Sequence, residues 1–115
     1  MILIAFGTRP EYIKIKPLIE TFANNLNYEL LFTGQHQDLL NNISGPKIRR
    51  LKIQDGPNRL DSIVSSIMNQ SNIFEGVTSV IVQGDTTSAF SVALAAFHRK
   101  IDIIHLEAGL RTLRS

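Results

Sequence analysis

The stretch Ile2–Lys14, ILIAFGTRPEYIK, decides the fold of this chain. Its first five residues form a continuous apolar run, which is typical of a strand buried on both faces of a parallel sheet. Thr8 is then a predicted helix N-cap with Glu11 three residues further on, and Pro10 suits the first turn because its missing N–H costs nothing there. Apolar residues recur at helical spacing over residues 11–25. The stretch therefore predicts a strand, a tight turn and a helix.

The rest of the chain repeats this alternation of strand and helix. Apolar runs predict further strands at residues 28–33, 49–53, 79–83 and 102–106, and helical spacing predicts helices at residues 37–42, 58–74 and 86–99. The helix at 58–74 is expected to turn four side chains inward, those of Leu60, Ile63, Ile67 and Phe74. This order predicts an α/β fold with a doubly wound, Rossmann-like parallel sheet.

The end of the chain is unusual for such a sheet. Only residues 107–115 follow the last predicted strand, and they contain no helix that would cover it. An all-parallel sheet with a bare final strand is rare, because both faces need helical cover. We therefore expect residues 1–115 to be one incomplete domain of a larger protein.

Composition excludes several classes of protein. With 43% apolar residues among 115, the chain can build a single core. The net charge is +2, and the densest basic group, Lys47, Arg49, Arg50 and Lys52, is smaller than a nucleic-acid footprint, so no nucleic-acid partner is expected. The absence of cysteine excludes disulfides and thiolate metal sites. The N-terminal apolar run is too short for a signal peptide or a membrane span, so we expect a cytoplasmic protein without membrane contact.

Polar clusters follow three of the predicted strands directly. They are Gly7-Thr8-Arg9-Pro10-Glu11, Gln83-Gly84-Asp85-Thr86-Thr87 and Glu107-Ala108-Gly109-Leu110-Arg111. The carboxyl ends of neighbouring parallel strands lie at one edge of the sheet, where open α/β sheets bind ligands. Arg9, Asp85 and Glu107 are therefore expected to share one site.

The first cluster predicts an anion site. The helix that begins at Pro10 points free N–H groups and a positive dipole end at whatever lies above the sheet, and Arg9 suits bidentate phosphate binding. Lys14 is a second candidate for the same anion. Neither the dinucleotide fingerprint G-x-G-x-x-G nor the P-loop motif is present. A solvated Arg9, with Thr8 acting only as a cap, is the alternative interpretation.

Asp85 and Glu107 are candidate catalytic carboxylates. Two carboxylates held at adjacent strand ends can differ in pKa, so that one acts as acid and the other as base on a substrate carbon. The alternative for Asp85 is an N-cap on the helix at 86–99. Glu107 follows an apolar run that only His105 interrupts, and it needs a partner or a ligand; Arg111 is a candidate partner. His36, His98 and His105 lack metal-ligand spacing, so no metal is expected; His98 is expected on an exposed helix end and His105 as a hydrogen-bonded core residue.

Four motifs in succession carry a resemblance to a known family. They are Gly7-Thr8-Arg9-Pro10-Glu11-Tyr12-Ile13-Lys14, Thr33-Gly34-Gln35-His36, Gln83-Gly84-Asp85-Thr86-Thr87 and His105-Leu106-Glu107-Ala108-Gly109-Leu110-Arg111-Thr112. Each follows a predicted strand, and together they span the chain. In these motifs the chain resembles the non-hydrolysing UDP-N-acetylglucosamine (UDP-GlcNAc) 2-epimerases.

The resemblance implies an enzyme of the GT-B type, in which two Rossmann-like domains bind the UDP-sugar in the cleft between them. This chain matches most of the N-terminal domain. The implied reaction converts UDP-GlcNAc into UDP-ManNAc by eliminating UDP to leave a 2-acetamidoglucal and adding UDP back on the other face. It uses no cofactor and no metal. The full-length enzyme is expected to be a homodimer that supplies precursors for surface polysaccharides.

Carried over residue by residue, the resemblance assigns roles to seven positions. Arg9 and Lys14 would contact the UDP, while Asp85 and Glu107 would be the acid and base carboxylates. Gln35, His36 and Arg111 would also contact the nucleotide sugar, the first two in a loop beside which bacterial members bind a second UDP-GlcNAc as activator. The second domain and a third family carboxylate are missing from these 115 residues, so we expect no turnover by the chain alone.

Two other functions stay open at this point. A hydrolysing relative would release ManNAc and UDP, but such enzymes tend to have Gly-Ser-Arg-Ala-Glu where this chain has Thr8 and Pro10. The other alternative is a nucleotide-sugar-binding or interaction module without activity.

Overall fold

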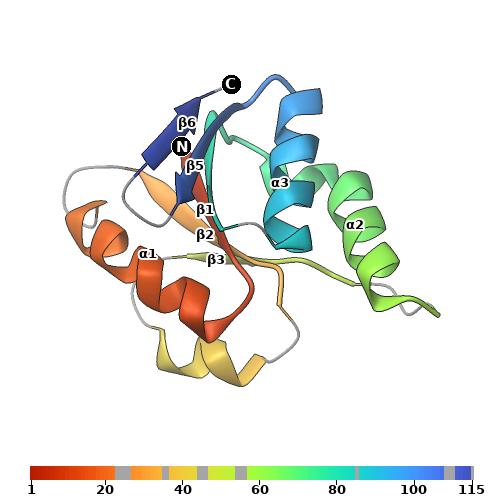
Figure 1. Ribbon diagram of the computed structural model, residues 1–115, viewed down its shortest axis with the longest axis horizontal. Helices are drawn as coiled ribbons and strands as arrows, with labels where there is room; N and C mark the ends of the chain where they lie inside the picture. The colour runs from red at the N-terminus through yellow and green to blue at the C-terminus, as the bar shows by residue number, and fades with distance from the viewer. Residues whose placement is uncertain are drawn as a thin grey trace.

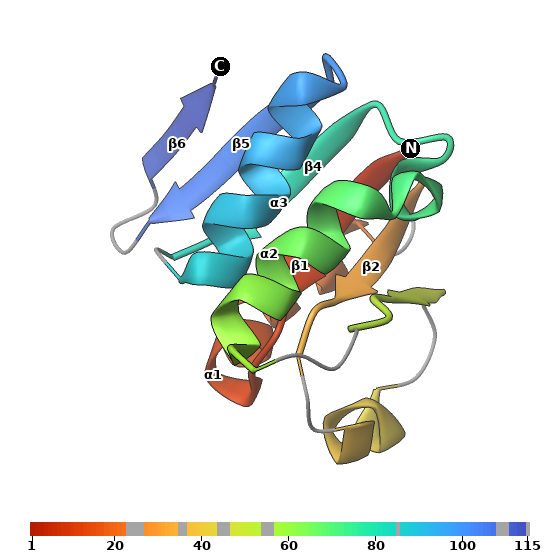
Figure 2. The ribbon, with the colours of Figure 1, turned by 90° about the vertical axis from the view of Figure 1, so that its right-hand side faces the viewer.

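The computed structural model describes residues 1–22, 27–34, 37–43, 47–53, 57–84, 86–107 and 111–114. Its strands are β1 (Ile2–Phe6), β2 (Tyr28–Phe32), β3 (Ile48–Arg50), β4 (Ser79–Gln83), β5 (Asp102–Glu107) and β6 (Arg111–Arg114). Its α-helices are α1 (Arg9–Phe22), α2 (Arg59–Asn69) and α3 (Thr87–His98), and two 3-10 helices are η1 (Gln37–Asn42) and η2 (Ser71–Phe74). Helix α1 lies on one face of the sheet and helices α2 and α3 lie side by side on the other (Figures 1 and 2).

The predicted doubly wound parallel sheet is confirmed. The strand order is β3-β2-β1-β4-β5-β6, and the first five of these strands are parallel to their neighbours. The order reverses direction at β1, so the chain builds outward from β1 to β3 and then from β4 to β5. The carboxyl ends of the five parallel strands form one edge, which we call the carboxyl edge.

The sheet contains one strand, β6, that the sequence analysis did not predict. Strand β6 pairs antiparallel with β5, so that Leu106 lies opposite Thr112 and Glu107 opposite Arg111. An antiparallel neighbour needs only a short connection, whereas a parallel one needs a crossover of a dozen residues or more. A short segment without a helix can therefore cover the edge of β5.

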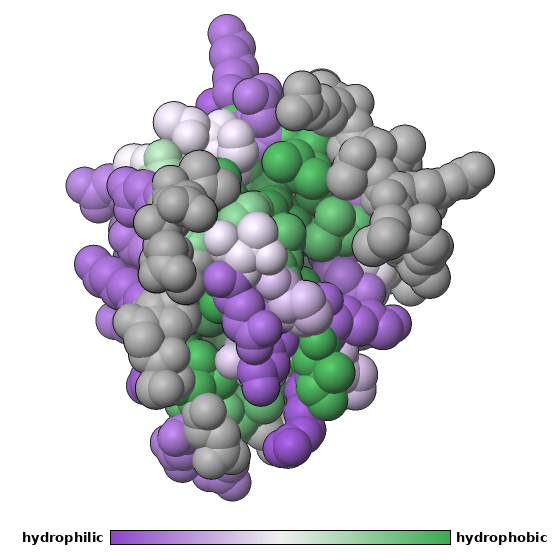
Figure 3. Space-filling model, turned by 90° about the vertical axis from the view of Figure 1, so that its left-hand side faces the viewer, coloured by the Kyte–Doolittle hydropathy of each residue, from purple (hydrophilic) through white to green (hydrophobic). Residues whose placement is uncertain are grey.

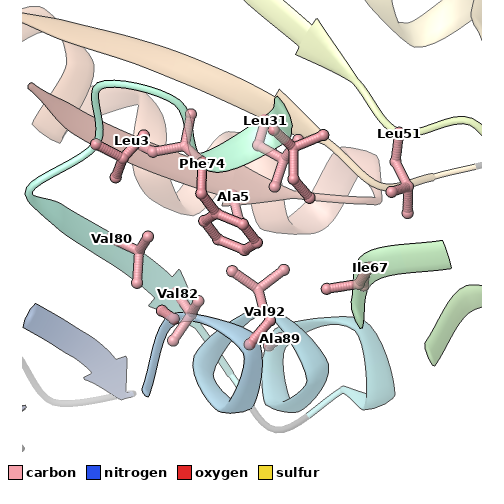
Figure 4. Close-up of a cluster of buried hydrophobic side chains, with 14 of the residues drawn as sticks. Leu3, Ala5, Leu31, Leu51, Ile67, Phe74, Val80, Val82, Ala89 and Val92 are labelled. Atoms are coloured by element: carbon pink, nitrogen blue, oxygen red, sulfur yellow. The ribbon is translucent and has the colours of Figure 1, made fainter. Parts of the chain in front are cut away.

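Alternating residues of the central strands enter two separate apolar clusters. In β1, Leu3 and Ala5 face the cluster under α2 and α3, while Ile4 and Phe6 face the cluster under α1. Figure 4 shows the first cluster, in which side chains of β1, β2 and β4 meet those of α2, η2 and α3. This two-sided burial is why the strands read as unbroken apolar runs.

Several element boundaries differ from the sequence prediction. The segment expected as one helix over 58–74 divides at Gln70 into α2 and η2. Leu60 does not turn inward; it is 56% exposed in the first turn of α2, where the Asn58 side chain accepts the N–H groups of residues 60 and 61. The third strand is shorter than the expected range 49–53, and the first helix is described as far as Phe22. The last expected residues of that helix, 23–25, lie outside the described residues.

One side of the sheet has less helical cover than the other. Ile104 and Leu106 of β5 pack against the cluster under α1 but are only partly buried. Figure 3 shows this side of the molecule, with apolar surface visible between hydrophilic side chains. None of the helices in the described residues is long and apolar enough to cross a membrane.

One cation of the basic group at residues 47–52, Arg49, is held by partners within the fold. Arg49 forms an ion pair with Glu29 at 2.8 Å and donates to the carbonyl of Ile73 at 3.1 Å. Both charged side chains are largely buried, with 17% and 18% of their surface exposed. Arg49 therefore joins β3 to β2 and η2, and its charge is not available to bind a polyanion.

Candidate functional site at the carboxyl edge

The ends of β1 and β2 approach each other so closely that only glycine fits. A Cβ atom at Gly34 would lie 2.0 Å from the carbonyl oxygen of Gly7 and 2.8 Å from the ring of Phe32. The buried Thr33 holds this approach, because its N–H and its hydroxyl both donate to the carbonyl of Phe6, at 2.9 and 3.3 Å. Contacts between Gly34 and Gly7 and between Thr33 and Phe6 therefore hold the ends of β1 and β2 together.

The β1–α1 corner, residues 7–12, is a reciprocal cap. The hydroxyl of Thr8 accepts the N–H of Glu11 at 3.3 Å, and the Thr8 carbonyl accepts the N–H of Tyr12 at 3.0 Å. The carboxylate of Glu11 in turn accepts the N–H of Gly7 at 2.9 Å and the hydroxyl of Thr8 at 3.2 Å. The predicted N-cap is confirmed, and Glu11 reaches back one residue further than a capping box requires.

The two predicted cations of this corner are exposed but do not point the same way. Among the described residues, neither Arg9 nor Lys14 forms a hydrogen bond or an ion pair, and both are exposed. Five residues of an α-helix turn through about 140°, so the two side chains leave α1 in different directions. Arg9 starts the helix at the carboxyl edge, whereas Lys14 lies about 7 Å further along the axis. Arg9 is thus the better placed cation for an anion at the helix N-terminus.

The β4–α3 corner comprises Gly84 and residues 86–89. Gly84 has φ +80°, a left-handed conformation that favours glycine, and it has open space around it. Strand β5 holds this residue, because the Gly84 N–H donates to the carbonyl of Leu106 at 3.1 Å and its carbonyl accepts Nε2 of His105. The expected hydrogen-bonded state of His105 is confirmed. The turn that precedes position 85 is therefore tied to the end of β5.

Thr86, and not Asp85, is the N-cap of α3. Its hydroxyl accepts the N–H of Ala89 at 3.1 Å, and its carbonyl accepts the N–H of Phe90 at 3.0 Å. The N-cap role considered for Asp85 from the sequence is therefore filled by its neighbour. Thr is also a preferred N-cap residue, although it ranks below Asp, and the two consecutive threonines after Asp85 were the signal for it.

The remaining predicted site residues stay predictions. Asp85, Gln35 and His36 lie outside the described residues. The backbones of Glu107 and Arg111 are described, and the register of β5 and β6 sets these two positions opposite each other. Because Gln83 of β4 pairs with Leu106 of β5, positions 84 and 107 follow neighbouring strand ends on the carboxyl edge.

A small pocket opens between the two corners. Its lining comes from β1, the start of α1, the end of β2 and the start of α3, and consists of Ala5, Phe6, Gly7, Glu11, Thr33, Ser88 and Ala89. Among the described residues, no group of three His, Asp or Glu side chains is arranged to hold a metal ion. The lining contains the carboxylate of Glu11, the hydroxyls of Thr33 and Ser88, and apolar side chains.

Glu11 is the residue whose importance the sequence did not reveal. As part of a helix cap, Glu11 is a local feature of α1. Its second carboxylate oxygen, however, also accepts the hydroxyl of Thr86 at 3.5 Å, from a residue 75 positions away in the sequence. The pattern of Thr8 and Glu11 predicts the cap, but only the tertiary structure brings α3 within reach. Glu11 therefore joins the two corners.

These features define a class of protein. A parallel sheet with a reversal at β1, a glycine turn at the end of β1 and a helix whose N-terminus faces the carboxyl edge make this chain a Rossmann-like α/β domain.

Comparison with known proteins gives the family. The family model described as UDP-N-acetylglucosamine 2-epimerase matches residues 20–114. The chain is 39% identical over 120 residues to the UDP-N-acetylglucosamine 2-epimerase of Campylobacter jejuni and 34% identical over 126 residues to that of Escherichia coli, with 96% of the chain covered in both cases. The chain belongs to the UDP-N-acetylglucosamine 2-epimerase family.

Solved structures show the same relationship in three dimensions. The UDP-GlcNAc 2-epimerase of Neisseria meningitidis bound to UDP-GlcNAc superimposes with a TM-score of 0.80 at 34% identity, and that of Methanocaldococcus jannaschii with 0.69 at 30% identity. The chain spans about a third of the length of these relatives, 31% to 33%, and corresponds to their N-terminal part.

Proposed function

We propose that this chain provides the N-terminal half of the active site of a non-hydrolysing UDP-GlcNAc 2-epimerase with two Rossmann-like domains of the GT-B type. The observation that carries the proposal is the exposed Arg9 at the N-terminus of α1, which has no hydrogen bond or ion pair within the described part of the chain and lies at the carboxyl edge where β4 and β5 also end. A free guanidinium beside a helix N-terminus suits a diphosphate. Thr8 and Pro10 in the first motif favour the non-hydrolysing reaction over the hydrolysing one.

The reaction requires a base, an acid and a clamp on the leaving group. A base removes the proton from C2 of the sugar, the C1–O bond to UDP breaks, and a 2-acetamidoglucal is left. UDP then bonds to C1 again while an acid returns a proton to C2 from the other face. We assign Asp85 and Glu107 to the proton transfers, in line with their positions after adjacent strands.

Binding of UDP is assigned to the cations of α1. Arg9 would hold the phosphates, and Lys14 would contact the same nucleotide from further along the helix. Gln35, His36 and Arg111 are assigned to the nucleotide sugar. Because Thr86 already caps α3, Asp85 is not needed as a cap, which supports a role for it in the chemistry.

The test is proton exchange at C2. The longest natural gene product that contains this chain is incubated with UDP-GlcNAc in D2O and followed by NMR. We expect deuterium at C2 and UDP-ManNAc as product, and we expect Asp85→Asn to abolish both, since an amide cannot accept the proton. Unchanged exchange in the Asp85→Asn variant would refute the role of Asp85, and free ManNAc would indicate the hydrolysing reaction.

We also propose that the complete enzyme is a homodimer. Helix α3 contains no Asp, Glu, Lys or Arg, and its outward side chains Phe90, Leu94 and Phe97 are 69%, 36% and 63% exposed. A helix that is apolar on every side is normally covered, and a second copy would present the same surface in return.

The dimer proposal predicts an effect of two aromatic side chains. Replacing Phe90 and Phe97 together by Ser should convert dimer into monomer, measured by sedimentation equilibrium, because aromatic side chains dominate such contacts. Ile13→Ser is the matched control, since Ile13 is 57% exposed on α1, on the other face of the sheet. Equal dimerisation of the double variant and the wild type would place the interface elsewhere. A cytoplasmic location stays a prediction.

A further inference from the structure

The carboxylate of Glu11 lies between the N-termini of two helices on opposite faces of the sheet. One oxygen accepts the Gly7 N–H and the Thr8 hydroxyl, and the other accepts the Thr86 hydroxyl. Each of these two threonine hydroxyls also accepts the N–H of the third residue of its helix, Glu11 in α1 and Ala89 in α3. A negative charge is favoured at this place, because both helix dipoles have their positive ends there.

The hydrogen-bonding capacity of the two threonines fixes the direction of these contacts. A hydroxyl has one proton to donate, and in both threonines it goes to Glu11 while a lone pair accepts a backbone N–H. The bond to Thr86 is the longest of the set at 3.5 Å, so it is the contact that a ligand between the corners can most easily shorten or lengthen.

The connected residues are the neighbours of the proposed active-site groups. Thr8 precedes Arg9, and Thr86 follows Asp85. A change in the contact between Glu11 and Thr86 therefore changes the distance between the start of α1, where the anion is proposed to bind, and the start of α3. Glu11 also lines the pocket between the corners, together with Ser88 of α3.

We propose that Glu11 is a positioning residue, which sets the start of α3 at Thr86 at a fixed distance from the N-terminus of α1. The proposal rests on the proposed function. No proton transfer is assigned to Glu11, whose oxygens accept the Gly7 N–H and the two threonine hydroxyls. Its effect on the reaction comes from geometry, and misplacement of a catalytic group by about 1 Å can reduce turnover about 100-fold.

The first experiment separates kcat from KM in the longest natural gene product that contains the chain. Glu11→Ala should lower kcat for C2 exchange by roughly 10- to 100-fold with KM for UDP-GlcNAc changed less than about threefold, because the start of α3 is misplaced while the anion site remains. Glu11→Gln keeps the reach of the side chain and should recover most of kcat. Glu20→Ala is the matched control, since Glu20 is an exposed glutamate of the same helix.

The second experiment does not depend on activity. Amide 15N and 1H shifts of Gly84 and Thr86 should move in Glu11→Ala and stay unchanged in Glu20→Ala. If Glu11→Ala does not fold, Glu11→Asp replaces it, since it keeps the charge and is one methylene shorter.

The outcomes decide the two proposals separately. A kcat within threefold of wild type in Glu11→Ala, a change confined to KM, or unmoved amides at Gly84 and Thr86 would overturn the positioning role. Absence of C2 exchange in the wild-type protein would overturn the proposed function, and the amide shifts would then still decide whether Glu11 positions the start of α3.

Discussion

The β1–α1 corner and the β4–α3 corner have the same sequence of structural features, but glycine is required at each for a different reason. Each has a strand end, a glycine turn and a threonine that caps a helix. At the first corner glycine is needed because β2 leaves no room for a side chain, whereas Gly84 of the second corner has open space and is needed for its backbone angle. Close contact with β2 determines the glycine of the first corner, and a left-handed backbone angle determines the glycine of the second.

The helices that follow differ as well. Helix α1 starts with the exposed Arg9 and is suited to an anionic ligand, while α3 carries no Asp, Glu, Lys or Arg and presents aromatic residues outward. The proposed ligand binding and the proposed self-association therefore use different helices on opposite faces of one sheet. Glu11 is the contact through which the two corners meet.

The largest effect is expected at Gly34. Gly34→Ala should lower the free energy of unfolding by about 3 kcal/mol, because the new Cβ would lie 2.0 Å from the Gly7 carbonyl oxygen and the backbone must move. Chemical denaturation measures the loss. Gly76→Ala is the control: Gly76 has φ +75° and no atom near its missing Cβ, so only about 1 to 2 kcal/mol should be lost. Equal losses at the two glycines would show that close contact does not distinguish the first corner.

A smaller effect is expected for the cation of the first corner. Arg9→Ala should weaken UDP binding about 10- to 100-fold, since a charge-assisted hydrogen bond is lost, and should leave the free energy of unfolding within about 0.5 kcal/mol of wild type. Isothermal titration and denaturation provide the two measurements. Lys16→Ala, an exposed lysine on the same helix, should bind UDP like the wild type. A loss of stability in Arg9→Ala without a loss of binding would make Arg9 a structural residue.

The smallest effect is expected at the second corner. Gly84→Ala should cost about 1 to 2 kcal/mol of unfolding free energy, because an L-residue with φ near +80° is strained even where space is open. Gly84→Asn should cost less, since Asn tolerates this conformation better. Equal losses for Gly84→Ala and Gly84→Asn, or a loss for Gly84→Ala as large as that for Gly34→Ala, would contradict this. Lack of space, and not the backbone angle, would then be the reason for glycine at position 84.

The order of strands and helices, the two-sided burial of the sheet and the cap at Thr8 follow from the amino-acid sequence alone. These features are local or periodic: apolar runs, helical spacing and capping residues act over a few residues and can be read without partners. The motifs after the strands likewise indicate the family through their residues alone.

Tertiary structure decided what depends on neighbours distant in sequence. Only the sheet order explains why a short segment, β6, can cover β5, and only the packing of β2 on β1 explains why Gly34 must be glycine. The outward position of Leu60 and the choice of Thr86 over Asp85 as the cap depended on where each helix begins, which propensity fixes only to within a few residues. The contact between Glu11 and Thr86 joins residues 75 positions apart, and a carboxylate shared by two helix N-termini exists only once both helices have packed against the sheet.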